Sequence, residues 1–296
     1  LPVAETFTFR DDAGQSLADI ARLDTMVTVV DGLNFLRDFQ AAEQLASRGE
    51  ALGEDDERSI TDLLIEQVEF ADVILISKID LISRAEREEL KAILQRLNAE
   101  AEILPMVMGE IALKKILDTR RFDFERAAQS PGWLKEMRGE HVPETQEYGI
   151  ASTVYRAVRP FHPERFFNVI DRPWTNGKLL RSKGFFWLAS KYQEAGSWSQ
   201  AGGLMRYGYA GRWWRFVPQD QWPEDAETRA EIFKKWLPET ADCRQELVFI
   251  GQHIDFNALT VELDACLLTD AEVAMGPEAW LQLSDPFGDW YSEVAA

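Results

Sequence analysis

Two short, nearly continuous apolar runs constrain the fold of the first half of the chain most strongly. They read MVTVV at residues 26–30 and VILI at residues 73–76. Strands that are buried on both faces of a parallel sheet have this composition, because helices cover both faces of such a sheet. A third apolar stretch, at residues 103–108, predicts a further strand. The runs therefore predict a parallel sheet.

Apolar residues at helical spacing separate and follow these strands. They are Ile60, Leu63, Leu64 and Val68 before the second run, and Leu90, Ile93, Leu94 and Leu97 after it. Ser83 followed by Glu86 forms a capping box that predicts where the second helix begins. Alternating strands and helices favour an α/β fold, whose ligands bind beyond the carboxyl ends of the strands. Asp31 and the loop at residues 77–80 are therefore expected at the functional edge.

The second half has a different pattern, which predicts an α+β domain. Periodicity weakens between residues 119 and 149, where we place a linker. Aromatic and β-branched residues then predict strands at 151–158, 179–188, 212–217 and 246–250. A polar helix is predicted near residues 226–236, and an amphipathic helix at residues 256–267 is followed by a capping-box pattern from Thr269 to Glu272.

Charge is distributed unevenly along the chain. The net charge is −19, but residues 151–215 carry a net +8 between flanks of −14 and −13. The overall charge disfavours diffuse binding to nucleic acid or to an anionic membrane surface, and no apolar run is long enough to span a bilayer. Strand alternation predicts that Phe186 and Leu188 point inward, whereas Lys183 and Trp187 belong to a basic, aromatic surface. The favoured partner of this basic block is the protein's own acidic helices, ahead of an acidic protein client and of nucleic acid.

Cysteine and histidine are scarce, with two and three residues respectively. This composition suits a reducing cytosol, so a cytoplasmic location is expected. Core packing is the favoured role for Cys266, and capping or packing for His162. Half of a metal site at Cys243 and His253 is a minor alternative, and the acidic residues 54–57 are interpreted as a solvated loop in preference to a cation site.

The Ser77-Lys78-Ile79-Asp80 loop carries the clearest chemistry. A carboxylate two residues after a lysine, in the loop that leaves a buried strand, suits guanine recognition. Asp80 can accept hydrogen bonds from the ring N1–H and the exocyclic amine together, a donor pair that adenine lacks. The Lys78 stem can lie across the base while its ammonium stays solvated. Asp31, at the neighbouring strand end, could reach magnesium or the nucleotide, and an equally favoured role is to stabilise its own loop.

The region around this loop, residues 62–81, resembles the CobW-type P-loop GTPases, a family of metal-insertion chaperones. Other segments resemble the same family in the same order along the chain. In the first half they read LPVAETF at residues 1–7 and VTVVDG at 27–32, and in the second half RPFHPER at 159–165, RSKGFFWLA at 181–189 and QELVFIG at 245–251.

The resemblance implies a fold and a division into domains. Residues 1–120 would form part of a P-loop NTPase domain with a Rossmann-like parallel sheet, residues 121–149 a linker, and residues 150–296 a CobW C-terminal-like α+β domain. Ser77, Lys78 and Asp80 would bind the guanine base. The family's guanine loop usually begins with asparagine, so Ser77 is a departure that bears on nucleotide affinity.

The resemblance also implies a function. It indicates a GTPase that uses GTP and Mg²⁺, cycles to GDP, and delivers Zn²⁺ or Co²⁺ to a client metalloprotein. Neither the phosphate-binding pattern Gly-x-x-x-x-Gly-Lys-Ser/Thr nor the family's Cys-x-Cys-Cys motif occurs in the 296 residues. We therefore expect the catalytic and metal-binding residues upstream of Leu1, and this chain alone to be inactive. The alternative is a nucleotide-independent protein-interaction module that uses the basic second domain.

Overall fold

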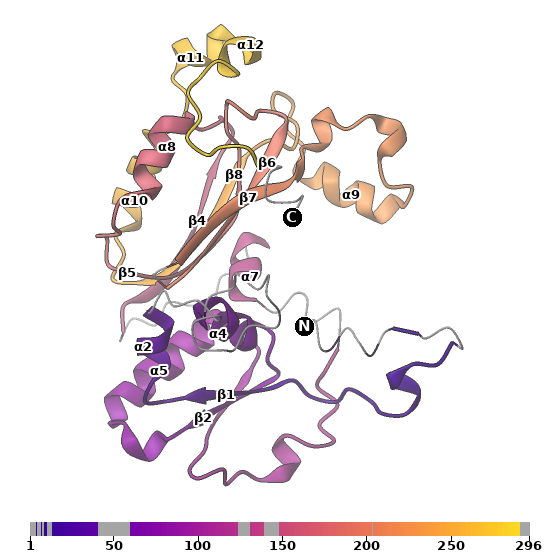
Figure 1. Cartoon of the computed structure of the whole chain (residues 1–296), viewed down its shortest axis with the longest axis vertical. Helices are drawn as coiled ribbons and strands as arrows, with labels where there is room; N and C mark the ends of the chain where they lie inside the picture. The colour runs from indigo at the N-terminus through magenta and orange to yellow at the C-terminus, as the bar shows by residue number, and fades with distance from the viewer. Residues whose placement is uncertain are drawn as a thin grey trace. The chain divides into compact units, whose positions relative to one another are not determined.

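The computed structural model describes residues 4, 7, 9–10, 14–40, 60–123, 131–138, 148–202 and 204–290. The chain divides into two compact units, and each is considered by itself (Figure 1). Unit 1 comprises Leu1–Ile150 with Gly202–Leu204, and unit 2 comprises Ala151–Ala201 with Met205–Ala296. In the described part of the chain, no helix is both long and apolar enough to cross a membrane.

Unit 1 contains a three-stranded parallel sheet in the order β1-β2-β3. The strands are β1 (Val27–Asp31), β2 (Val73–Ser77) and β3 (Glu102–Pro105). Its α-helices are α2 (Phe35–Gln40), α4 (Ile60–Glu69), α5 (Arg84–Leu97) and α7 (Gly132–Arg138), and its 3-10 turns are η2 (Leu17–Asp19), η3 (Ile79–Leu81) and η4 (Leu113–Lys115). The parallel α/β architecture predicted for the first half is confirmed.

Burial differs between the two apolar strands. Val73, Ile74, Leu75 and Ile76 of β2 are each at most 3% exposed, as a strand covered on both faces should be. In β1, however, Val27 is 38% and Val29 56% exposed, so the expectation that this strand is buried on both faces is wrong. Val27 and Val29 lie on the same face of the strand because side chains alternate, whereas Val30 on the other face is 2% exposed, so the described residues bury β1 on one face only.

Two sets of side-chain hydrogen bonds stabilise helix ends in unit 1. Ser83 and Glu86 form the predicted capping box at the start of α5. At the end of α5, the fully buried Asn98 amide donates to the carbonyls of Val68, Glu69 and Ala71 at 2.9–3.2 Å and so satisfies the end of α4. Within the predicted linker, α7 packs against α5, and Lys135 forms an ion pair with Glu100 at 2.6 Å. The predicted boundaries of the two domains and of the linker stay a prediction.

Unit 2 is an α+β domain built on a five-stranded sheet in the order β4-β8-β5-β6-β7. The strands are β4 (Ile150–Ala157), β5 (Lys178–Phe186), β6 (Glu194–Ala201), β7 (Leu204–Arg212) and β8 (Gln245–Gln252). β5 pairs antiparallel with both β6 and β8. The remaining elements are α8 (Pro163–Ile170), η5 (Trp214–Phe216), η6 (Gln219–Gln221), α9 (Ala226–Lys234), α10 (Phe256–Asp264), α11 (Asp270–Met275) and α12 (Pro277–Trp280).

Helices α8 and α10 cover one face of this sheet (Figure 1). The core beneath them includes Phe166 of α8, Phe186 of β5, Phe249 of β8 and Leu263 of α10. A glycine permits the close packing of β5 on β8, because a Cβ atom on Gly184 would clash with the backbone carbonyl of Glu246. The predicted α+β class of the second half is confirmed.

One predicted strand is wrong and two strands were not predicted. The chain at residues 212–217 is not a strand, because β7 ends at Arg212 and a 3-10 turn follows. The cause is Asp242, whose carboxylate accepts hydrogen bonds from the backbone N–H groups of Trp214 at 2.7 Å and Arg215 at 3.0 Å. Strand β6 contains glycine, serine and glutamine, and two glycines interrupt β7, so both give a weak strand signal.

Candidate functional site

The carboxyl ends of β1 and β2 meet at one edge of the parallel sheet. Asp31 is in register with Ser77, so the two loops predicted to be functional begin side by side. The backbone N–H of Gly32 donates to the Ser77 carbonyl at 3.0 Å, and the Ser77 hydroxyl donates to the Val30 carbonyl at 3.1 Å. The single hydrogen bond that the Ser77 hydroxyl donates is thus used to join the two strand ends.

Asp31 organises the loop that follows β1. Its Oδ1 accepts hydrogen bonds from the backbone N–H groups of Leu33 and Asn34, at 3.0 and 3.2 Å. Its Oδ2 accepts from the Asn34 amide at 2.8 Å and from the Lys78 ammonium at 2.7 Å. Burial raises the pKa of Asp31, but the hydrogen bonds from Lys78 and Asn34 outweigh it and hold the pKa below its ordinary value. Both carboxylate oxygens are engaged, which favours the loop-stabilising role over a magnesium ligand.

Lys78 and Asp80 present their side chains to solvent. Lys78 has a left-handed backbone conformation, with φ 54° and ψ 30°, and caps the short turn η3 that contains Asp80. Its side chain is 47% exposed despite the ion pair with Asp31. Asp80 is exposed, and no residue in the described part of the chain forms a hydrogen bond or ion pair with its carboxylate. That carboxylate is therefore available to an incoming pair of donors.

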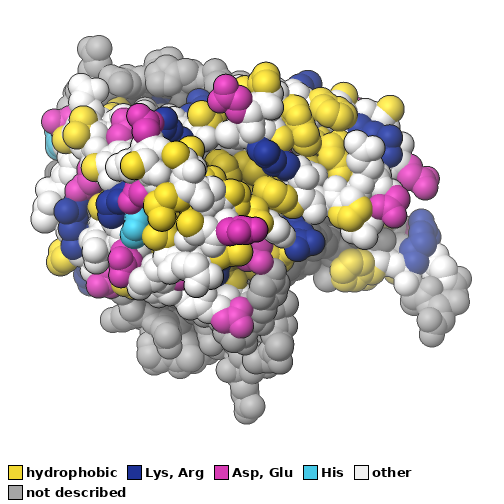
Figure 2. Space-filling model, turned by 90° about the horizontal axis from the view of Figure 1, so that it is seen from above, with side chains coloured by type: hydrophobic (Ala, Val, Ile, Leu, Met, Phe, Trp, Pro, Cys, Tyr) yellow, Lys and Arg dark blue, Asp and Glu magenta, His cyan; other side chains and the backbone are white. Residues whose placement is uncertain are grey.

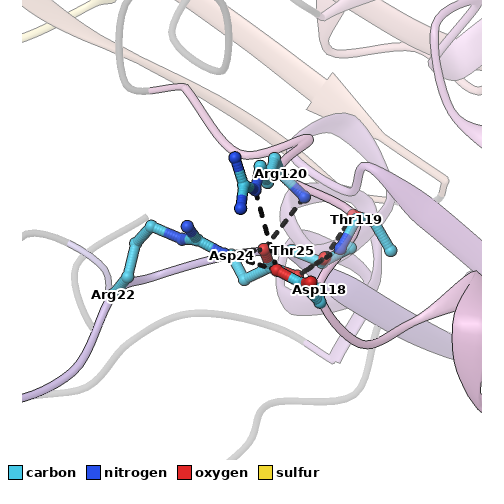
Figure 3. Close-up of polar contacts among 6 residues, drawn as sticks. All are labelled: Arg22, Asp24, Thr25, Asp118, Thr119 and Arg120. Carbon is cyan, nitrogen blue, oxygen red and sulfur yellow. Dashed lines mark hydrogen bonds and ion pairs between the residues drawn. The ribbon is translucent and has the colours of Figure 1, made fainter.

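A second polar cluster, which the sequence did not reveal, is centred on Asp24 ahead of β1 (Figure 3). The Asp24 carboxylate accepts hydrogen bonds from the backbone N–H groups of Thr119 and Arg120 and from the side chains of Thr25 and Arg22, at 2.8–3.0 Å. Burial alone would raise the pKa of Asp24, but these bonds lower it to about 2. The cluster joins the segment after η4 to the amino edge of the sheet, opposite the 77–80 loop, and so has a structural role.

The described cysteines and histidines do not form a metal centre. Cys243 and His253 lie beyond opposite ends of the eight-residue strand β8, and at about 3.3 Å per residue they are roughly 25–30 Å apart. Cys243 is fully buried, and burial raises its pKa to about 12. Cys266 is buried in the core as predicted, with a pKa raised by burial to about 11. Among the described residues, no group of three or more His, Cys, Asp or Glu side chains could hold a metal ion, and residues 54–57 lie outside those residues.

His162 joins two segments of unit 2 through its backbone. It occupies the N-cap position of α8, before Pro163, but its side chain caps no backbone N–H. The backbone N–H of His162 donates to the Cys266 carbonyl at 2.8 Å, which joins the start of α8 to the chain after α10. Burial, and then the nearby Arg165 guanidinium, lower the pKa of His162, which favours the neutral imidazole.

At least five of the eleven basic side chains of residues 151–215 pair with carboxylates of the acidic segment that follows, and three of these carboxylates lie on α10 and α11, as the preference for acidic helices predicted. The pairs are Arg156–Glu246, Arg159–Asp270, Arg165–Glu272, Arg172–Glu262 and Lys191–Asp285. Figure 2 shows Lys and Arg side chains interspersed with Asp and Glu on the face in view, without one continuous basic patch. The prediction that Trp187 lies on a basic, aromatic surface is wrong: it is 5% exposed because Trp213 and Cys243 pack with it, and its indole N–H donates to the Tyr192 carbonyl.

Comparison with known families agrees with this architecture. A model of the CobW/HypB/UreG nucleotide-binding domain matches residues 1–105, and a model of the cobalamin synthesis protein cobW C-terminal domain matches residues 150–267. Together the two matches cover well over half of the chain, and they occur in the order that the two units follow. The chain belongs to the CobW family.

Two individual relatives and one solved structure are similar to the chain over most of its length. Zinc-regulated GTPase metalloprotein activator 1 of Dictyostelium discoideum is 44% identical over 292 residues, which is 97% of this chain and 61% of that protein. A zinc chaperone of Mycobacterium tuberculosis is 26% identical over 285 residues, 95% of this chain and 65% of the relative. The chain thus spans less than two thirds of the length of these relatives. The Zn(II)-bound YjiA GTPase from E. coli is similar at 18% identity and a TM-score of 0.31, over 90% of this chain and 67% of that one.

Proposed function

We propose that the protein binds GTP through its 77–80 loop and couples GTP hydrolysis to the delivery of zinc, or cobalt, to a client metalloprotein. The observation that carries this proposal is the arrangement of Lys78 and the exposed Asp80 carboxylate, which has no partner among the described residues, at the carboxyl edge of a parallel sheet. Two relatives, named as a zinc-regulated GTPase metalloprotein activator and a zinc chaperone, support the choice of nucleotide and cargo.

In this proposal the guanine base is selected by hydrogen bonding. Asp80 accepts from N1–H and from the exocyclic amine, and each charge-assisted bond contributes about 1.5–3 kcal/mol. The Lys78 stem covers one face of the base, while Ser77 holds the loop against β1 through its bond to Val30. These contacts discriminate against adenine, which presents an acceptor at N1.

Phosphate, magnesium and zinc are assigned to none of the described residues. The pattern that cradles phosphates does not occur in the printed sequence. The Asp31 oxygens already accept four hydrogen bonds, and the described cysteines are buried as protonated thiols, so neither set fits a metal ion. Bound GTP with Mg²⁺ would stabilise one conformation and GDP another, and this difference in affinity would drive metal release.

The alternative of a nucleotide-independent interaction module has less support. It depends on a free basic and aromatic surface on unit 2. Five basic side chains of the block are paired with acidic residues of the same unit, and Trp187 is buried. The pairing weakens the attraction that such a surface would offer an acidic partner.

Steady-state hydrolysis by the full-length protein tests the proposal. GTP turnover is measured with and without zinc, together with transfer of zinc to a fluorescent chelator, and ATP serves as the control nucleotide. We expect hydrolysis of GTP in preference to ATP and zinc transfer that depends on GTP. Absence of GTP hydrolysis both with and without zinc would refute the proposal.

A further inference from the structure

The ion pair between Asp31 and Lys78 joins the ends of two neighbouring strands that are 47 residues apart in the chain. The Lys78 ammonium donates to Asp31 Oδ2 at 2.7 Å. A lysine side chain has four rotatable bonds, and an exposed one samples many rotamers, so an ammonium that is held at one end restricts the whole stem. The proposed function uses this stem to cover the base.

We propose that Asp31 is a positioning residue for guanine nucleotides, which acts by holding Lys78 in the orientation that receives the base. This inference rests on the proposed function, since it concerns the same loop. It adds a residue from a different strand, and it assigns to the Asp31 carboxylate a part in nucleotide affinity that requires no contact with the nucleotide.

Asp31 is suited to this role because it is itself held rigidly. Its second oxygen accepts from two backbone N–H groups in the turn that follows β1, so the carboxylate has little freedom to rotate. Gly32 lies so close to the next strand that a Cβ atom there would be 2.7 Å from the Ser77 carbonyl oxygen. The loop that carries Asp31 and the loop that carries Lys78 are therefore fixed against one another before any ligand binds, which reduces the entropy lost on binding.

The size of the effect is limited by exposure. The side chains of Lys78 and Asp31 are 47% and 34% exposed, so solvent screens the pair, and partially exposed ion pairs have small energies. We expect removal of the Asp31 charge to weaken binding of a guanine nucleotide by about three- to fivefold. An effect of this size is measurable by titration with a fluorescent analogue.

A double-mutant cycle in the full-length protein tests the inference. The variants are Asp31→Asn, Lys78→Met and the combination of both, titrated with N-methylanthraniloyl-GDP. Asparagine keeps the oxygen that accepts from the two backbone N–H groups of the turn but loses the bond from the Asn34 amide, so thermal unfolding checks that the loop stays folded. Glu102→Gln is the matched control: it removes a carboxylate that is also ion-paired, with Lys115 at 2.7 Å, but from the first residue of β3 at the amino end of the sheet.

The cycle separates positioning from a structural effect. We expect Asp31→Asn alone to raise the dissociation constant about three- to fivefold and the KM for GTP similarly, with kcat unchanged, and to have no further effect in the Lys78→Met background. Equal losses in both backgrounds, or no loss in either, would overturn the inference. If the wild-type protein bound no guanine nucleotide, the proposed function itself would fail, and that result is distinct from additivity in a protein that binds.

Discussion

The segment beyond α12 is predicted to be essential for the stability of unit 2, and Phe287 provides the test. Its side chain is 6% exposed and belongs to the core, although it lies 20 residues beyond the match to the C-terminal domain model. The ring packs against four aromatic side chains at centroid distances of 4.9–5.9 Å: Phe166, Phe167, Phe186 and Tyr207.

The expected loss of stability on Phe287→Ala follows from this burial. Replacing a core phenylalanine by alanine costs about 3–5 kcal/mol, from lost burial and from the cavity. Because residues 281–290 form neither helix nor strand and can relax into part of the cavity, we expect the lower value, about 3 kcal/mol. For a unit of this size the loss corresponds to a melting temperature lower by roughly 6–12 °C.

Urea unfolding followed by tryptophan fluorescence measures the effect. Nine of the ten tryptophans lie between residues 174 and 290, so the signal reports mainly on unit 2. Leu281→Ala is the control, because this leucine is in the same segment but is 52% exposed and should cost less than about 0.5 kcal/mol. A loss below about 1 kcal/mol for Phe287→Ala would refute the view that the segment completes the core.

Three further predictions concern other parts of the chain. Asn98→Ala should destabilise unit 1 by about 2–3 kcal/mol, because three carbonyls lose a buried donor; faster amide exchange in α4 and β2 would reveal it, and unchanged exchange would contradict it. Hydrogen bonding to Arg165 lowers the pKa of Glu272 to about 2, so the charged carboxylate stabilises the fold above its unfolded value of about 4.5 and this contribution disappears as the pH falls toward 2. Glu272→Gln should therefore cost about 1 kcal/mol at pH 7 and little at pH 2, whereas a pH-independent cost would exclude the ion pair as its cause. Buried Cys243 and Cys266 should react with Ellman's reagent at pH 8 only after urea is added, and rapid reaction of the native protein would contradict their burial.

The strongest sequence signals were those that depend on local pattern. The continuous apolar run of β2 and the capping box at Ser83 were correctly predicted, because strand burial and helix capping are encoded within a few residues. The expectation that β1 is buried on both faces was wrong, since burial of each face depends on which distant segments pack against it. Strands β6 and β7 were missed because their stability comes from packing and from pairing, of β6 with β5 and of β7 with β6, and glycines interrupt the strand preference of their own residues.

For the candidate site too, features encoded by local pattern were predicted and contacts between distant residues were not. The sequence placed Asp31 and the 77–80 loop at one edge, because carboxyl ends of parallel strands share an edge. It could not show that Lys78 pairs with Asp31, or that Asp24 gathers donors from residues 119 and 120, because those partners are 47 and about 95 residues away. Likewise, the charge balance indicated that the basic block pairs with the acidic segment, but which arginine meets which carboxylate depended on the fold.

In the proposed function, the Asp80 carboxylate binds the guanine base. Xanthine carries a carbonyl where guanine carries its exocyclic amine, so a side-chain amide at position 80 suits xanthine and a carboxylate suits guanine. The direct measurement compares the binding of GTP and xanthosine triphosphate to full-length wild-type protein and to Asp80→Asn. We predict at least a tenfold shift in preference toward xanthosine triphosphate, from the loss of about 1.5–3 kcal/mol with GTP. An unchanged preference would show that Asp80 does not contact the base.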